Sequence, residues 1–189
     1  MTTFPTAERR RESWIRAHGD GVAVDDALAF FDGLPEVPTD DLLGRWRGSG
    51  LPTGSPLDGL LEAYGWYGKE FLDAEGVHPL LFRTRSGPRP INPALLPLSV
   101  LRDRPAVAHS RAARAAFSVV RPALRTARPT ARLRTVRHRG VDTAAMVYDA
   151  LPIIDVFRRV SADQLLGLMD MRGLLAPFFF LLQRDPAGA

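Results

Sequence analysis

The sequence predicts a mainly β protein with helical additions (α+β), built on an antiparallel β-barrel. Three observations point to this fold class. The pentapeptide Gly44-Arg45-Trp46-Arg47-Gly48 is typical of a first strand, because its glycines let neighbouring backbones pass closely while its indole closes one end of the barrel. Residues 129–185 have the pattern of a β meander, and helical periodicity marks residues 1–40 and 94–128.

The segment 1–40 is predicted to be helical. Val24, Ala27, Leu28 and Phe31 follow the spacing i, i+3, i+4, i+7, which places them on one face of a helix. We therefore expect an N-terminal helical segment that precedes the barrel.

Residues 41–189 are predicted to form a single barrel domain. In its first part, 41–93, short apolar runs are broken by glycine and proline, a pattern that favours strands and loops over long helices. The second part, 94–128, is a helical insertion limited by Pro105 and Pro122. Such an insertion plugs an open barrel end or acts as a lid, and both alternatives stay open.

The third part, 129–185, carries the clearest strand pattern. Turn residues separate strands at intervals of about 10 residues, as in antiparallel sheets and barrels. The expected strands are Ala131–Arg137, Thr143–Asp149, Ile153–Val160, Leu165–Met171 and Phe178–Arg184. Residues 177–182, which include most of the last strand, are apolar throughout, so we expect a helix to cover one side of the barrel there.

Composition limits the class of protein. A chain of 189 residues can bury a sizeable core without a structural metal. The absence of cysteine excludes disulfides, thiolate nucleophiles and cysteine zinc sites. No window approaches the roughly 20 apolar residues of a membrane-spanning helix, so we expect no membrane span and a cytoplasmic location.

The basic residues are concentrated between Arg102 and Arg139, and the net charge is +4. This stretch raises a nucleic-acid hypothesis. However, its only aromatic residue is Phe117, which argues against a base-stacking platform. We expect a basic, solvated surface, and the functional alternative is that this surface steers an anionic ligand. A homodimer is also possible from the sequence.

Two blocks of the sequence resemble known families. The block from Leu42 to Phe82 contains the pentapeptide above and is similar to the family named for its GXWXG motif. The block from Arg137 to Asp185 resembles the DUF4334 domain that accompanies it. The stretches that carry the resemblance are Trp66-Tyr67-Gly68-Lys69, Val77-His78-Pro79-Leu80, Met146-Val147-Tyr148-Asp149, Pro152-Ile153-Ile154-Asp155-Val156-Phe157-Arg158 and Gly167-Leu168-Met169-Asp170. Because both families are of unknown function, the resemblance implies no reaction.

The resemblance does imply a calycin-like barrel, since Gly-x-Trp near a first strand is similar to the openings of lipocalins and nitrobindin-like haem proteins. Such barrels hold a small apolar ligand. Nitrobindin-like proteins use a histidine near the end of the chain to bind haem, whereas the last histidine here is His138. We therefore expect no cofactor.

Asp155 and His78 are the candidate catalytic residues. Strict alternation places Asp155 and Arg158 on opposite faces of their strand. A carboxylate inside an apolar barrel rises in pKa unless a cation or backbone amides hold its charge, which makes it a usable general acid or base. The alternatives are a structural ion pair for Asp155 and a turn hydrogen bond for His78. The four histidines lack metal-binding spacings, so we expect no metal.

The ligand-binding candidates are aromatic, sulfur-containing or charged side chains of the two blocks. They are Trp46, Tyr64, Trp66, Tyr67, Lys69, Met146, Tyr148, Phe157 and Arg158. The alternative is that they form an ordinary packed core.

Three functions stay open. The first is binding of a small hydrophobic or amphipathic molecule, such as a lipid, terpenoid or polyketide, in the barrel pocket. The second is a cofactor-free cyclase or isomerase that acts on such a ligand by acid–base catalysis. The third is nucleic-acid or protein binding through residues 102–139. The sequence alone therefore does not decide whether the protein is an enzyme.

Overall fold

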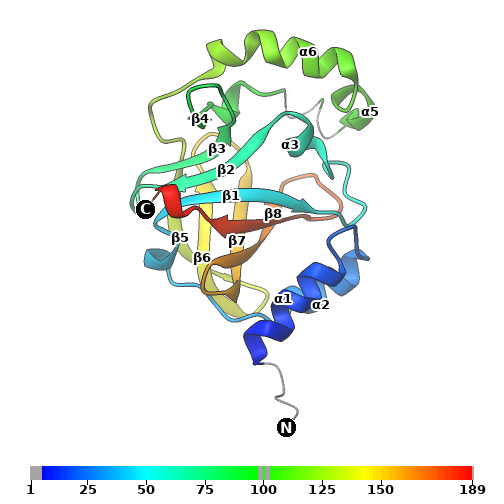
Figure 1. Cartoon of the computed structure of the whole chain (residues 1–189), viewed down its shortest axis with the longest axis vertical. Coiled ribbons are helices and arrows are strands. Elements are labelled where there is room, and N and C mark those ends of the chain that lie inside the picture. Colours follow the sequence, from blue (N-terminus) through cyan, green and yellow to red (C-terminus); the bar gives the residue numbers. More distant parts are fainter. Residues whose placement is uncertain (1–5, 98–99, 101–102, 189) are drawn as a thin grey trace.

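The computed structural model describes residues 6–97, 100 and 103–188, and it shows a closed antiparallel β-barrel with helices around it (Figure 1). The strand order is β2-β1-β9-β8-β7-β6-β5-β3-β4. An additional pairing between β2 and β3 closes eight of these strands into the barrel and leaves β4 outside it. The predicted fold class is therefore confirmed.

The strands and helices follow one another along most of the chain. The strands are β1 (Gly44–Leu51), β2 (Trp66–Phe71), β3 (Val77–Phe82), β4 (Arg89–Pro90), β5 (Ala131–His138), β6 (Val141–Tyr148), β7 (Ile153–Ser161), β8 (Gln164–Met171) and β9 (Phe178–Arg184). The helices are α1 (Ala7–Ala17), α2 (Val24–Asp32), α3 (Leu60–Ala63), α5 (Pro105–Ala108) and α6 (Arg111–Val120). Short 3₁₀ turns are η1 (Thr39–Leu42), η2 (Pro93–Leu95), η3 (Arg121–Leu124) and η4 (Pro186–Gly188).

Two glycines explain why β1 and β2 approach so closely. A Cβ atom on Gly48 would lie 2.1 Å from the Trp66 ring, and one on Gly68 would lie 1.8 Å from the Trp46 carbonyl oxygen. Gly68 also has a φ of 148°, which L side chains rarely adopt. The β2–β3 register shifts on both sides of Gly68, and this bulge brings Trp66 and Lys69 to the same inner face.

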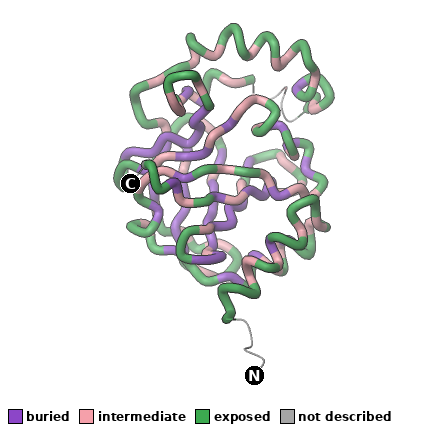
Figure 2. The backbone as a smooth tube through the Cα atoms, viewed as in Figure 1, coloured by how far each residue is buried: buried purple, intermediate pink, exposed green. Residues whose placement is uncertain are grey.

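Buried residues are concentrated in the strands of the barrel (Figure 2), and they form two hydrophobic clusters. The barrel interior contains a cluster of large side chains that includes Trp46, Phe157 and Phe180. A second cluster lies between the outer face and the helices α1 and α2. There Phe179 of β9 meets Phe31 of α2, with ring centroids 6.0 Å apart. The apolar sequence of β9 therefore has a partner on each face.

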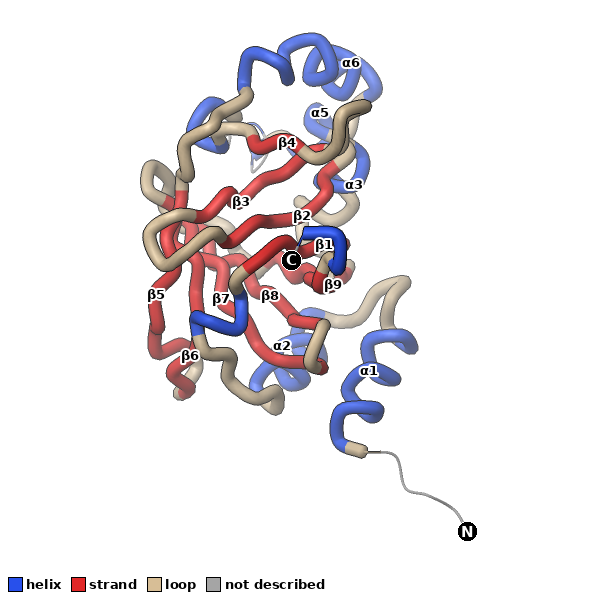
Figure 3. The backbone as a smooth tube through the Cα atoms, turned by 60° about the vertical axis from the view of Figure 1, so that its left-hand side comes forward, coloured by secondary structure: helices blue, strands red, loops and turns tan. Residues whose placement is uncertain are grey.

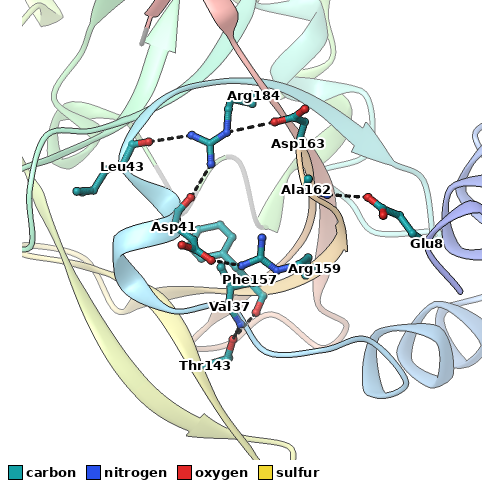
Figure 4. Close-up of polar contacts among 10 residues, drawn as sticks. All are labelled: Glu8, Val37, Asp41, Leu43, Thr143, Phe157, Arg159, Ala162, Asp163 and Arg184. Carbon is teal, nitrogen blue, oxygen red and sulfur yellow. Dashed lines mark hydrogen bonds and ion pairs between the residues drawn. The ribbon is translucent and has the colours of Figure 1, made fainter.

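One end of the barrel is closed by η1 and by polar contacts around it (Figure 4). The Thr143 hydroxyl accepts a hydrogen bond from Val37 N at 2.9 Å and donates one to Phe157 O at 2.8 Å. The Arg184 guanidinium donates to the carbonyl oxygens of Asp41 and Leu43, at 2.7 and 3.1 Å. The two Thr143 bonds satisfy buried backbone groups that would otherwise be left without partners.

The opposite end, where β7 and β9 begin, is the mouth of the barrel. Helices α3, α5 and α6 lie on this side, away from α1 and α2 (Figure 3). The Phe117 ring of α6 meets the rings of Tyr64 and Phe82, with centroids 4.9 and 5.3 Å apart. The Tyr64 hydroxyl donates to Ala108 O of α5 at 2.7 Å, so the helical cover is tied to the barrel rim. In the described ranges, no helix has both the length and the apolar character that crossing a membrane requires.

Candidate functional site

An apolar cavity of about 80 Å³ lies inside the barrel near its mouth. Most of its walls are aliphatic or aromatic. Examples are Leu57, Leu60, Leu80, Ile153, Phe178 and Phe180. Lys69 of β2, Tyr148 of β6 and Asp155 of β7 bring polar groups into this surface.

Lys69 and Asp155 form a buried ion pair at this cavity. The Lys69 Nζ atom lies 2.7 Å from Asp155 Oδ2, and the two side chains are 3% and 1% exposed. Nζ also donates to the Pro79 carbonyl oxygen at 3.2 Å. It lies 4.8 Å from the Phe180 ring centroid and 5.7 Å from that of Trp66, so two aromatic faces stabilise the cation further.

Burial changes the acid–base behaviour of the two acidic groups. It raises the pKa of Asp155, although Lys69 and the nearby Tyr148 hydroxyl pull that pKa down. Burial also raises the pKa of Tyr148 well above 10, and the Asp155 charge adds to this effect. The Asp155 Oδ1 atom is buried and has no hydrogen-bond partner in the protein. The site therefore offers an open acceptor beside a protonated hydroxyl and a cation.

A second apolar cavity, of about 300 Å³, lies beneath α6. Tyr64 and Phe117 are among the residues that line it. Leu60, Leu61 and Leu96 line both cavities, so these three side chains stand between the two spaces.

The structure brings four of the residues that the sequence suggested to one cavity and places a fifth at the other. Trp66, Lys69, Tyr148 and Asp155 line the inner cavity, and Tyr64 lines the second. The four residues of the inner cavity come from separate parts of the chain and meet because β2 faces the adjacent strands β6 and β7 across the barrel.

The other ligand-binding candidates lie elsewhere. Trp46, Met146 and Phe157 are packed in the interior cluster, where the Trp46 indole donates to Leu42 O at 2.7 Å. The Tyr67 hydroxyl donates to Asp185 instead. Arg158 donates to the His138 carbonyl oxygen at 3.0 Å and lies against the Phe31 ring, which places it on the outer face under α2.

Sequence reasoning did not single out several residues that line the inner cavity. They are Leu57, Leu60, Leu80, Met169, Met171, Phe178 and Phe180. The sequence signal that could have identified some of them is the alternation within β8 and β9, which places residues 169 and 171 on one face of β8 and residues 178 and 180 on one face of β9. Alternation alone does not say which group faces inward.

His78 lies opposite Glu70 in the β2–β3 register and lines neither cavity. Burial lowers the pKa of His78 below its usual 6.5, while the nearby Glu70 charge raises it. A base with a depressed folded-state pKa stabilises the fold above the unfolded pKa, and this stability is lost as the pH falls through the folded pKa.

We therefore expect the free energy of unfolding to fall between about pH 7 and pH 5. His138, whose pKa burial also lowers, acts in the same direction. The measurement is urea denaturation at both pH values, and His78→Gln should lose less stability on acidification than the unchanged protein. An equal loss in both proteins would exclude His78 as a source of acid sensitivity.

Part of the basic stretch is neutralised by acids on the barrel surface. Arg102 lies outside the described residues. Ion pairs of the described part of the stretch include Arg132–Asp149, Arg134–Glu75, Arg137–Asp142 and Arg139–Asp32. Within the part of the chain that the structure describes, no group of three or more histidine, aspartate or glutamate side chains is placed to hold a metal ion.

Comparisons with known proteins agree with this architecture. The profile of the family described as GXWXG protein matches residues 29–87, and that of the domain of unknown function DUF4334 matches residues 129–184. Among curated proteins, none matches the chain significantly.

A crystal structure of a protein from Thermomonospora curvata is similar over almost the whole chain. The sequence identity is 34% and the TM-score 0.68, with 95% of this chain and 98% of that chain covered. This similarity supports the barrel fold described above, and it assigns no activity. The chain belongs to the family defined by the GXWXG and DUF4334 regions.

Proposed function

We propose that the barrel binds a small, mainly apolar molecule that carries one polar oxygen group. The observation that supports this proposal is the buried Lys69–Asp155 pair in an apolar cavity, with Asp155 Oδ1 left without a partner. A buried polar atom without a hydrogen bond costs about 1–3 kcal/mol. A ligand hydroxyl that donates to Oδ1 would remove this cost, and the apolar walls would hold the rest of the molecule.

The cavity volumes indicate an elongated ligand. The inner cavity of about 80 Å³ is smaller than the roughly 150 Å³ cavity that accommodates benzene. A lipid-like or terpenoid-like molecule therefore needs the second space of about 300 Å³ as well. Its polar end would lie at Asp155 and its tail would pass Leu61 to reach the underside of α6.

The test combines extraction with defined probes. Native mass spectrometry of the purified protein, followed by solvent extraction, identifies any bound molecule. Linear alcohols of increasing length are then compared by thermal unfolding, because a ligand that binds the folded state raises the melting temperature. We expect 1-decanol to stabilise more than decane, which cannot donate to Asp155.

Matched variants locate the binding site. Leu61→Trp places a large side chain between the two cavities and should abolish the decanol effect, whereas Leu72→Trp, at a side chain that is 52% exposed, should retain it. Absence of both a bound molecule and any probe-induced shift would overturn the proposal. If the two variants lose the decanol effect to the same extent, decanol does not bind in these cavities.

A second candidate function is acid–base catalysis on the bound molecule, as in a cyclase or isomerase. The raised pKa of Asp155 beside Tyr148 favours it. When the extracted ligand is known, incubation with the protein and chromatography would detect conversion. Conversion that persists in Asp155→Asn would exclude Asp155 as the acid or base.

A further inference from the structure

Lys69 is the one lysine among the 25 lysine and arginine residues of the chain. Everywhere else the protein uses arginine, whose guanidinium stays protonated and is a poor nucleophile. The single primary amine of a side chain is also buried, at 3% exposure, in the wall of the apolar cavity. The only lysine of the sequence thus lies in the wall of the cavity that we propose to bind the ligand.

The environment of Lys69 differs from that of the surface ion pairs. In the Arg137–Asp142 pair, for example, the side chains are 72% and 63% exposed. At Lys69 the apolar surroundings disfavour both charges of the pair. Transfer of a proton from the ammonium to Asp155, whose pKa burial raises, gives a neutral amine next to a neutral acid. A desolvated lysine of this kind is a nucleophile for carbonyl compounds.

We propose that Lys69 forms a Schiff base with an apolar aldehyde or ketone bound in the cavity. The proposal rests on the ligand-binding function above and names its substrate class. In the first step Asp155 accepts a proton from Nζ, and the nitrogen lone pair attacks the carbonyl carbon. The π electrons move to the oxygen, which takes up a proton from the nitrogen and becomes the hydroxyl of a carbinolamine.

In the second step Asp155 returns its proton to that hydroxyl. The C–O bond breaks, water leaves and the nitrogen lone pair forms the C=N bond. The product is a protonated imine paired with the Asp155 carboxylate, so the buried pair keeps one charge of each sign. The net reaction converts an amine and a carbonyl compound into an imine and water, and it needs no oxidant or reductant.

Two features of the site fit this sequence of steps. The protonated Asp155 carboxyl, whose Oδ1 atom has no other hydrogen-bond partner, is free to donate to the carbinolamine hydroxyl, and the Tyr148 hydroxyl lies near the same carboxyl. The apolar walls limit access of water, which would otherwise hydrolyse the imine.

Trapping by reduction tests the proposal. The protein is incubated with decanal and sodium cyanoborohydride, and the adduct is located by intact mass and peptide mapping. Because the chain has one lysine, the α-amino group is the other amine that can react. We expect one alkyl group on Lys69, protection by 1-decanol, and no adduct at position 69 in Lys69→Arg.

Two further variants separate chemistry from folding. Asp155→Asn should slow trapping roughly a hundredfold. Should that variant fail to fold, Tyr148→Phe serves instead, with slower trapping expected there and an unchanged rate in the matched control Tyr67→Phe, whose hydroxyl contacts Asp185.

The outcomes distinguish the two proposals. The Schiff-base proposal is wrong if decanal is trapped only on the α-amino group. It is also wrong if Lys69 reacts equally fast in urea-unfolded protein. If 1-decanol still raises the melting temperature, the binding function stands without it. If decanol has no effect and no adduct forms at Lys69, both proposals fail.

Discussion

Asp155→Leu is expected to lower the free energy of unfolding by about 3–5 kcal/mol, because it leaves the Lys69 ammonium buried without its counter-charge. The two side chains are almost fully inaccessible and their charged atoms lie 2.7 Å apart. The remaining partners of Nζ, a backbone carbonyl and two aromatic faces, do not neutralise its charge. Urea denaturation near pH 7 measures the loss.

The double variant Lys69→Met with Asp155→Leu should recover most of this stability, since both charges are then replaced by apolar groups of similar volume. Asp142→Leu is the matched control, because its partner Arg137 is exposed and 3.7 Å away. It should change stability by less than about 1 kcal/mol. A loss in Asp155→Leu no greater than in this control would contradict the account of a buried, charged pair.

Gly48→Ala is expected to destabilise the barrel by about 3 kcal/mol through overpacking. The new methyl group would lie 2.1 Å from the Trp66 ring, and that indole is held by a 2.9 Å hydrogen bond to Gly68 O and by an edge contact with Phe180. Since Trp66 lines the inner cavity, its displacement should also remove the decanol effect.

The measurements are denaturant unfolding and tryptophan fluorescence. Gly33→Ala is the control, because a Cβ atom there would have its nearest neighbours at 3.5 and 3.7 Å, which is ordinary contact. If Gly48→Ala is as stable as Gly33→Ala and its tryptophan fluorescence matches that of the unchanged protein, then β1 does not pass beneath Trp66.

The architecture could be predicted because its signals are local. Turn residues and alternation marked the strands β5 to β9 within a few residues of their observed bounds, and the glycines of the GXWXG motif marked β1. The continuous apolar run in β9 predicted a helix against one side of the barrel, which α2 provides through Phe31. Each of these inferences depends on residues that are neighbours in the sequence.

The site depends on contacts that no local pattern contains. Alternation separated Asp155 from Arg158, but both are fully buried, because helices cover the outer face as well. Polarity therefore gave no sign of which residue faces inward. Lys69 reaches the cavity with Trp66 because the bulge at Gly68 shifts the register, whereas strict alternation places residues 66 and 69 on opposite faces.

The closure of the barrel by β1 and β9 has a consequence for how the chain reaches its native state. Arg184 and Asp41, joined by a hydrogen bond at this seam, are 143 positions apart. The entropy of bringing such distant segments together must be overcome before their contacts stabilise the product. We expect folding in milliseconds to seconds, and during synthesis the ring stays open, with β1 unpaired on one side, until β9 has left the ribosome.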